Sequence, residues 1–190
     1  MAIPPRTPVV VAVGEITHRG DSVVDPIDLA CEAARRALQD AGAAIGHRID
    51  TVATPGILMI PRDNPASRIA EAVGLAPRRR ISCPIGGNTP QYLVEVLGGD
   101  IVRGISDAVL VVGAETGESA RRVKSGHALR DPKPVDAQDE SLGDTRPGLS
   151  PAEMCATSPT LTPASLAIAV RLSPRPCIRA NAVAPAWRCS

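Results

Sequence analysis

The first two thirds of the chain alternate between short apolar runs and longer segments with regularly spaced apolar positions. Val9–Gly14 contains no polar residue, and such a run predicts a buried strand. Over Asp25–Ala41, small and apolar residues recur at spacings of three and four, which predicts a helix with one apolar stripe. By the same criteria we expect strands at 49–55, 80–85 and 107–114, and helices at 64–75 and 89–105. This βαβαβαβ order predicts an α/β fold with a mainly parallel sheet.

Each of the three predicted helices begins with the same local pattern. An oxygen-bearing side chain precedes a proline in Asp25-Pro26, Asn64-Pro65 and Thr89-Pro90. The oxygen can accept a hydrogen bond from a first-turn amide, and proline suits the first helical position. We therefore expect all three side chains to act as N-caps. Gly42 and Gly74 are expected where the first two helices end.

The pattern weakens towards the carboxyl terminus. Residues 119–130 predict an amphipathic helix, whereas 131–190 are rich in Pro, Ser, Thr, Ala and Arg without clear periodicity. The expected organisation is therefore a disordered leader (1–8), a partial domain (9–130) and an irregular or disordered tail (131–190).

Composition excludes several classes of function. With a net charge of +1, electrostatics do not favour binding to nucleic acid or an anionic membrane. Arg78–Arg80 is expected to be a solvated loop before a strand rather than a phosphate-binding patch. The five cysteines contain no C-x-x-C pair, which argues against a disulfide framework or a metal site and favours a reducing, cytoplasmic setting. No apolar stretch approaches the ~20 residues that a bilayer span needs. Since aromatic residues make up 1% of the chain, the core must consist of Val, Ile, Leu and Ala.

A glycine-rich segment precedes the third predicted helix. In Gly86-Gly87-Asn88-Thr89 the glycines allow close approach of a ligand, and the free amides of a helix start favour an anion or an oxyanion. A plain structural turn is the alternative. Neither a dinucleotide-binding nor a P-loop motif is present.

Three segments in order resemble a known superfamily. They are D-P-I-D-L-A-C-E-A-A-R-R-A-L-Q-D-A-G-A, then G-G-N-T-P-Q, then I-V-R-G-I-S-D-A-V-L-V-V-G-A-E. Together they are similar to the amino-terminal part of the thiolase superfamily, in particular to thiolase-like proteins of the acetyl-CoA acetyltransferase type. The resemblance covers about 9–122, with a fainter echo at 143–153. It implies a thiolase-like half-fold and acyl-CoA as substrate or ligand, with no other cofactor.

The resemblance also implies that the nucleophile is missing. A working thiolase carries its nucleophilic cysteine at a position that corresponds here to Gly87. Cys83 is a poor substitute because it falls inside a predicted strand, and Cys31 lies on the apolar stripe of the first helix. Glu115 resembles an acidic residue of the family, and we expect it to support loops near the site. The family's histidine base and second cysteine belong to its carboxy-terminal half, so the histidines here are expected at the surface: His18, His47 and His127.

The family fold pairs two similar halves, with the third helix of each between two sheets. The resemblance implies that this chain ends before the last strand of the first half, so that a homo-oligomer or the missing half would cover helix 89–105. We hypothesise that the reading frame shifts after about 153; a natural disordered tail is the alternative. Translating the coding DNA in the other frames separates the two.

Three functions remain open. The first is a thiolase-like acyl-CoA acyltransferase of lipid metabolism that is inactive on its own, and the second is a non-catalytic module that binds acyl-CoA or a partner. The third is a truncated product without function. A flavodoxin-like or Rossmann-like protein also fits the alternation but lacks the phosphate-binding loop.

Overall fold

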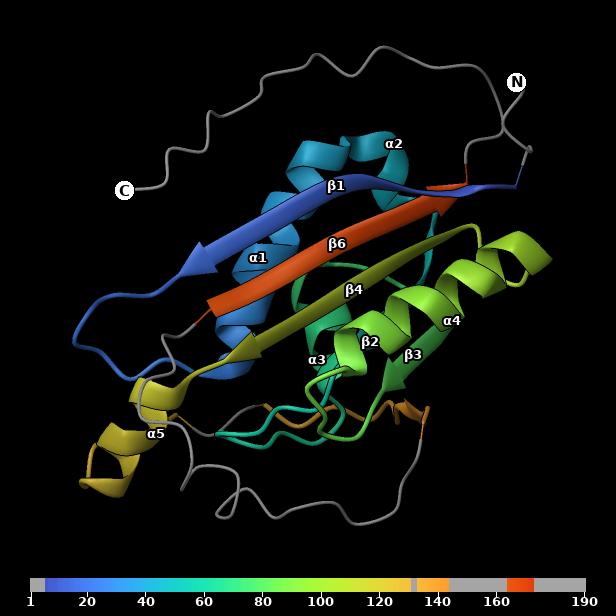
Figure 1. Ribbon diagram of the computed structural model, residues 1–190. Coiled ribbons are helices and arrows are strands. Elements are labelled where there is room, and N and C mark those ends of the chain that lie inside the picture. Colours follow the sequence, from blue (N-terminus) through green and yellow to red (C-terminus); the bar gives the residue numbers. More distant parts are fainter. Residues whose placement is uncertain (1–5, 131–132, 144–163, 173–190) are drawn as a thin grey trace, which may run out of the picture.

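The computed structural model describes residues 6–130 and 133–143 and the backbone of strand 164–172 (Figure 1). Its centre is a six-stranded sheet with the order β1-β6-β4-β2-β3-β5. The strands are β1 (Pro8–Thr17), β2 (Ile49–Thr54), β3 (Arg79–Ser82), β4 (Ala108–Glu115), β5 (Glu140–Ser141) and β6 (Ala164–Leu172).

The sheet is mainly parallel, as the alternation predicts. β4, β2, β3 and β5 are parallel neighbours, whereas β6 is antiparallel to both β1 and β4. β1 therefore runs in the same direction as the parallel strands, and only β6 runs against them. The predicted α/β class and βαβαβαβ order are confirmed.

Helices cover both faces of the sheet (Figure 1). They are α1 (Pro26–Ala41), the short α2 (Ala43–Gly46), α3 (Pro65–Ala72), α4 (Thr89–Arg103) and α5 (Gly117–Lys124). α1 and α3 pack on one face in the larger buried cluster, and α4 packs on the other in a smaller one. β4 contributes side chains to both clusters, because successive side chains of a strand point to opposite faces of the sheet. Leu110 and Val112 belong to the first cluster, and Val109 and Val111 belong to the second.

α1 lies unusually close to β1. Ala33 and Ala37 of α1 are fully buried, and they face Gly14 of β1. A Cβ on Gly14 would be only 3.1 Å from the Cα of Ala37 and would overlap the carbonyl oxygen of Ala33. The stripe of alanines therefore brings the helix backbone almost into contact with the strand backbone.

Only one of the three predicted N-caps is confirmed. Asp25 accepts a hydrogen bond from the amide of Ile27 at 2.8 Å. The predictions for Asn64 and Thr89 are wrong: Asn64 adopts a left-handed conformation (φ 50°) without a cap bond, and Asn88 occupies the cap position of α4. α1 and α3 nevertheless begin at the expected prolines, because proline fixes φ whether or not a side chain caps the turn, whereas α4 begins at Thr89, one residue before Pro90.

The predicted absence of the last strand is wrong. Ala164–Leu172 forms β6, inserted between β1 and β4, within the segment expected to be an irregular tail. Its sequence alternates between large aliphatic residues and smaller or polar ones, A-S-L-A-I-A-V-R-L, which is a strand pattern that the Pro-rich and Ser-rich surroundings obscure. The proposed frameshift point near 153 and the remaining tail lie outside the described residues.

A returning segment, 133–143, lies along the edge of β3. The Asp139 carboxylate accepts hydrogen bonds from the amides of Ala66 and Ser67, both at 2.9 Å, and thus caps α3 in place of Asn64. It also accepts bonds from the hydroxyls of Ser67 and Ser82, each at 2.6 Å. One carboxylate from this segment therefore joins α3, β3 and the returning chain.

We expect Asp139→Ala to lower the free energy of unfolding by about 2 kcal/mol, because it removes a helix cap together with charge-assisted hydrogen bonds. Urea denaturation followed by circular dichroism measures this loss. Asp136→Ala is the matched control, since Asp136 is exposed three residues earlier in the same segment. Equal effects of the two substitutions would contradict the capping role of Asp139.

Candidate functional site

The candidate site is the turn between β3 and α4, at the carboxyl end of the parallel strands. The amide of Thr89 bonds to the carbonyl oxygen of Gly86 at 3.1 Å, and the Thr89 hydroxyl donates to the Pro84 carbonyl oxygen at 3.3 Å. Asn88 occupies the N-cap position without a side-chain cap bond. Pro90 has no N–H, and the Tyr92 amide bonds to the Asn88 carbonyl oxygen at 3.0 Å. Within the described residues, the amides of Gly87, Asn88 and Gln91 have no hydrogen-bond partner, and these are the donors that an anion or an oxyanion would meet here.

Gly87 is exposed at this turn, and its surroundings are open. A Cβ built on Gly87 meets no atom within 4 Å, whereas one on Gly86 would lie 2.8 Å from the Thr89 hydroxyl oxygen. Position 87 would therefore accept a cysteine side chain pointing into free space. The backbone at position 87 leaves room for a side chain. The position lacks a nucleophile because its residue is glycine.

The two cysteines among the described residues are poorly suited to nucleophilic attack. Cys83 is buried, and its amide bonds to the Thr54 carbonyl oxygen at 2.9 Å. Burial raises the pKa of the Cys83 thiol to about 11. Burial likewise raises the pKa of Cys31 on α1 to about 11, although Arg35 partly opposes the shift. A thiol with so high a pKa is almost entirely protonated at neutral pH, and the thiolate is the reactive form.

Glu115, at the end of β4, holds the loop that follows β2. Its carboxylate accepts hydrogen bonds from the amides of Leu58 at 2.7 Å and Met59 at 3.2 Å. Burial raises the pKa of Glu115, and these two bonds act in the opposite direction. Within the same loop, a Cβ on Gly56 would lie 2.6 Å from the amide nitrogen of Ile85, so the loop passes directly beside the β3–α4 turn.

The far end of this loop is tied to α1 by an ion pair between half-buried Arg62 and buried Asp25. Arg62 donates to Asp25 Oδ2 from Nε at 2.9 Å and from Nη2 at 2.6 Å. The other oxygen of Asp25 caps α1, so one carboxylate fixes both a helix start and the loop. Glu115 and Asp25 therefore give the loop a defined path beside the candidate site.

The histidines do not gather at this turn. His47 and His127 are exposed, as expected, and His127 Nδ1 lies 3.1 Å from the Arg122 carbonyl oxygen. His18 is half-buried after β1 and contacts the Ser22 hydroxyl at 3.1 Å. None of the three has a hydrogen bond to a residue of the β3–α4 turn in the described part of the chain.

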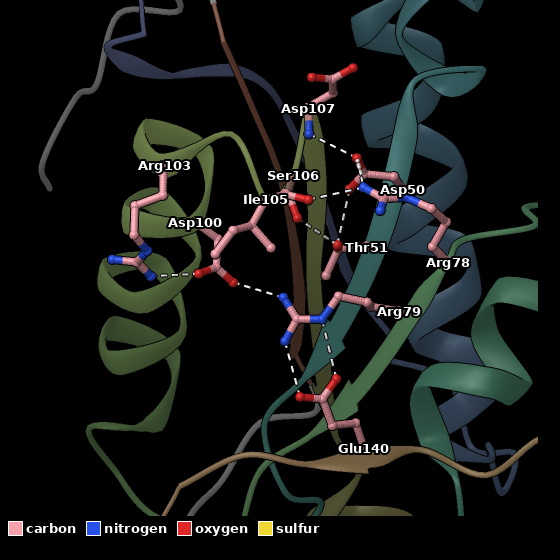
Figure 2. A network of polar contacts seen from close by, with 10 residues as sticks. All are labelled: Asp50, Thr51, Arg78, Arg79, Asp100, Arg103, Ile105, Ser106, Asp107 and Glu140. Carbon is pink, nitrogen blue, oxygen red and sulfur yellow. Dashed lines mark hydrogen bonds and ion pairs between the residues drawn. The ribbon is translucent and has the colours of Figure 1, made fainter.

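A second polar cluster anchors the opposite end of α4 (Figure 2). Arg79 donates to Asp100 Oδ2 of α4 at 2.8 Å and forms a two-bond contact with Glu140 at 3.0 and 3.2 Å. Arg78 pairs with Asp50 at 3.0 Å. The prediction that Arg78–Arg80 is a solvated loop holds for Arg78, which is exposed before the strand, and is wrong for Arg79 and Arg80, because β3 begins at Arg79. This cluster positions α4 and leaves no free cationic patch at Arg78 and Arg79.

No helix in the described ranges is long and apolar enough to cross a membrane. The sequence matches no known family profile and no curated protein.

Solved structures share this fold. A monomeric SCP2-thiolase-like protein type 1 from Mycobacterium smegmatis is 23% identical with a TM-score of 0.56, and the match covers 90% of this chain and 46% of that one. Cerulenin-bound OleA from Xanthomonas campestris is 16% identical with a TM-score of 0.58, covering 90% and 60% respectively. The present chain thus spans less than two thirds of either protein. At these identities the likeness concerns the fold alone, and it confirms the predicted half-fold.

Proposed function

Because the chain has a thiolase-like fold with glycine at the expected nucleophile position, we propose that it binds acyl-CoA thioesters without transferring the acyl group. The observation that carries this proposal is Gly87, exposed at the uncapped start of α4 with open space around it. The thioester class comes from the resemblance to the thiolase superfamily, and the Mycobacterium smegmatis neighbour is itself called SCP2-thiolase-like. The structural support is a helix start that suits a carbonyl oxygen or a phosphate.

The chemistry of the described residues fits binding better than turnover. Acyl transfer needs a thiolate within reach of the carbonyl carbon and a base that keeps it ionised. Cys31 and Cys83 are buried and protonated, and the Glu115 carboxylate is already engaged by two loop amides. What remains at the turn, among the described residues, is the amides of Gly87, Asn88 and Gln91, which can polarise a thioester carbonyl without attacking it.

We expect the purified chain to bind acetyl-CoA saturably in isothermal titration calorimetry and to release no free CoA in a thiol-detection assay. Absence of binding at millimolar ligand would contradict the binding proposal. CoA release by the unaltered chain would contradict the absence of catalysis.

Gly87→Cys tests the site directly. We expect the introduced thiol to be acetylated by acetyl-CoA: its thiolate forms a bond to the acyl carbon, the carbon–sulfur bond to CoA breaks, and CoA leaves as a thiol after taking up a proton. Intact-mass spectrometry detects the added acetyl group. The helix start should lower the thiol pKa by about one unit, which raises the thiolate fraction below neutral pH about tenfold. Because a less basic thiolate is a weaker nucleophile, alkylation should be about threefold faster than for an ordinary exposed cysteine.

Ser125→Cys is the matched control, because Ser125 is exposed at the carboxyl end of α5, where the helix field is reversed. A Cys83→Ser background removes the neighbouring native thiol. If both introduced thiols reacted equally fast with acetyl-CoA, the α4 start would not be the binding site.

A further inference from the structure

β1 forms one edge of the sheet. It pairs with β6 on one side, and no strand among the described residues pairs with it on the other (Figure 1). Its sequence begins P-V-V-V-A-V, and Val10 and Val13 are 57% and 50% exposed. An exposed, valine-rich edge strand is a template on which a strand of another chain can add. Unless other groups cover it, this edge is therefore a site of association.

Two side chains of α1 occupy backbone groups along this edge. The Asp40 carboxylate accepts a hydrogen bond from the Val13 amide at 3.3 Å, and Arg36 Nη1 donates to the Glu15 carbonyl oxygen at 2.8 Å. Residues two apart in a strand direct their amides and carbonyls to the same edge, and the opposite edge of β1 is taken by β6. A donor and an acceptor that an added strand would use are thus already bonded.

The close packing of α1 on β1 makes these contacts possible. Arg36 and Asp40 are four residues apart, so they lie one turn apart on the same side of the helix. Between them, Ala37 brings the helix backbone against Gly14, the residue of β1 that lies between the two contacts. Because the two backbones are so near, even the short side chain of an aspartate reaches the strand.

Both side chains are oriented towards the strand although they are exposed. Arg36 Nε donates to Glu32 Oε1 at 3.2 Å, which fixes the direction of the guanidinium group. Asp40 forms no ion pair within the described residues, so the Val13 amide is what holds its carboxylate. Exposed contacts of this kind contribute little to stability. Their larger effect is on what else can reach the edge of β1.

The beginning of the same edge is interrupted in another way. The register of β1 against β6 shifts between Val10 and Ala12. An irregularity of this kind increases the local twist, and a twisted edge accepts an added strand poorly. The regular part of β1 begins at Ala12, and Asp40 and Arg36 lie against that part.

We propose that Arg36 and Asp40 close the outer edge of β1 against the addition of a strand from a second copy of this chain. A second copy is the partner to exclude, because two identical edges carry the same donors and acceptors and can pair antiparallel about a two-fold axis. Strand addition needs the Val13 amide and the Glu15 carbonyl oxygen, and neither is free while the two α1 side chains hold them. This role is separate from acyl-CoA binding.

Removing both side chains tests the proposal. In sedimentation velocity, Arg36→Ala/Asp40→Ala should associate at a concentration at least tenfold lower than the unaltered chain, because its edge is open. Asp28→Ala/Arg35→Ala is the matched control: it also removes one acid and one base from exposed positions of α1 but leaves both edge contacts in place. Thermal melts show whether each variant is folded. Equal association of the two double variants would overturn the proposal.

A third change shows whether the association uses β1. Val13→Pro removes the amide that an added strand would bond, and proline is tolerated in an edge strand where the amide points outward. Added to Arg36→Ala/Asp40→Ala, it should return association to the level of the unaltered chain. If the melts show that Val13→Pro is unfolded, Val13→Lys gives the same test, because a lysine on an edge strand opposes pairing. Association that persists after the third change would show that β1 is not the surface involved and would refute the role of Arg36 and Asp40.

Discussion

Gly14→Ala is expected to lower the free energy of unfolding by about 3 kcal/mol or more. The added methyl group would meet the backbone of α1 at Ala33 and Ala37, and no side-chain rotation can relieve a clash with backbone atoms. Helix and strand must then separate, which opens the larger buried cluster along its length. Overpacking of a core costs about 1–3 kcal/mol where side chains can adjust, and more where they cannot.

Urea denaturation monitored by circular dichroism measures this effect, with Gly46→Ala as the control. A Cβ on Gly46 meets no atom within 4 Å, so this second glycine-to-alanine change should alter the free energy of unfolding by less than about 0.5 kcal/mol. Equal stability of Gly14→Ala and Gly46→Ala would mean that α1 does not lie as close to β1 as the structure shows.

Leu97→Ala should have a comparable effect, a loss of about 2–5 kcal/mol. Leu97 is fully buried in the cluster that joins α4 to the sheet. The other buried members of this cluster include no aromatic residue that could rotate into the cavity: Ala53, Ile81, Cys83, Leu93, Ile101, Val109 and Val111.

Leu97→Met keeps the volume nearly constant and should cost less than about 1.5 kcal/mol. The two variants should also differ in acetyl-CoA binding, because Leu97 holds α4, whose start forms part of the candidate site, against the sheet. Acetyl-CoA binding, measured by calorimetry at a temperature where both variants are folded, should weaken more in Leu97→Ala than in Leu97→Met. Equal loss of stability in the two variants would mean that Leu97 does not pack as the structure shows.

Most helices and strands could be predicted from the sequence because the residues that mark their ends lie within a few positions of those ends. Proline at the first turns and Gly42 at the end of α1 gave element bounds within a few residues. β6 was missed because its strand alternation lies among prolines and serines, and the choice between strand and coil there depends on its neighbours β1 and β4.

The same distinction applies to the candidate site: a feature set by neighbouring residues could be predicted, and contacts between residues far apart in the sequence could not. The position of Gly87 before a helix could be read from the sequence, since it depends only on the order of a strand, a turn and a helix. The capping of α3 by Asp139 could not, because the acceptor lies more than seventy residues from the amides it binds. Nor could the partners of Arg79, which come from α4 and from the returning segment.

The position of β6 has a consequence for the order of assembly during synthesis. Within the described residues, β1 pairs with no strand other than β6, although it is made first and β6 last. β2, β3 and β4 can pair with one another while the chain is still growing, but β1 must wait until β6 has been made, which takes on the order of ten seconds on a ribosome. Throughout that interval the valine-rich β1 is an unpaired strand on a nascent chain, the kind of segment that holding chaperones bind.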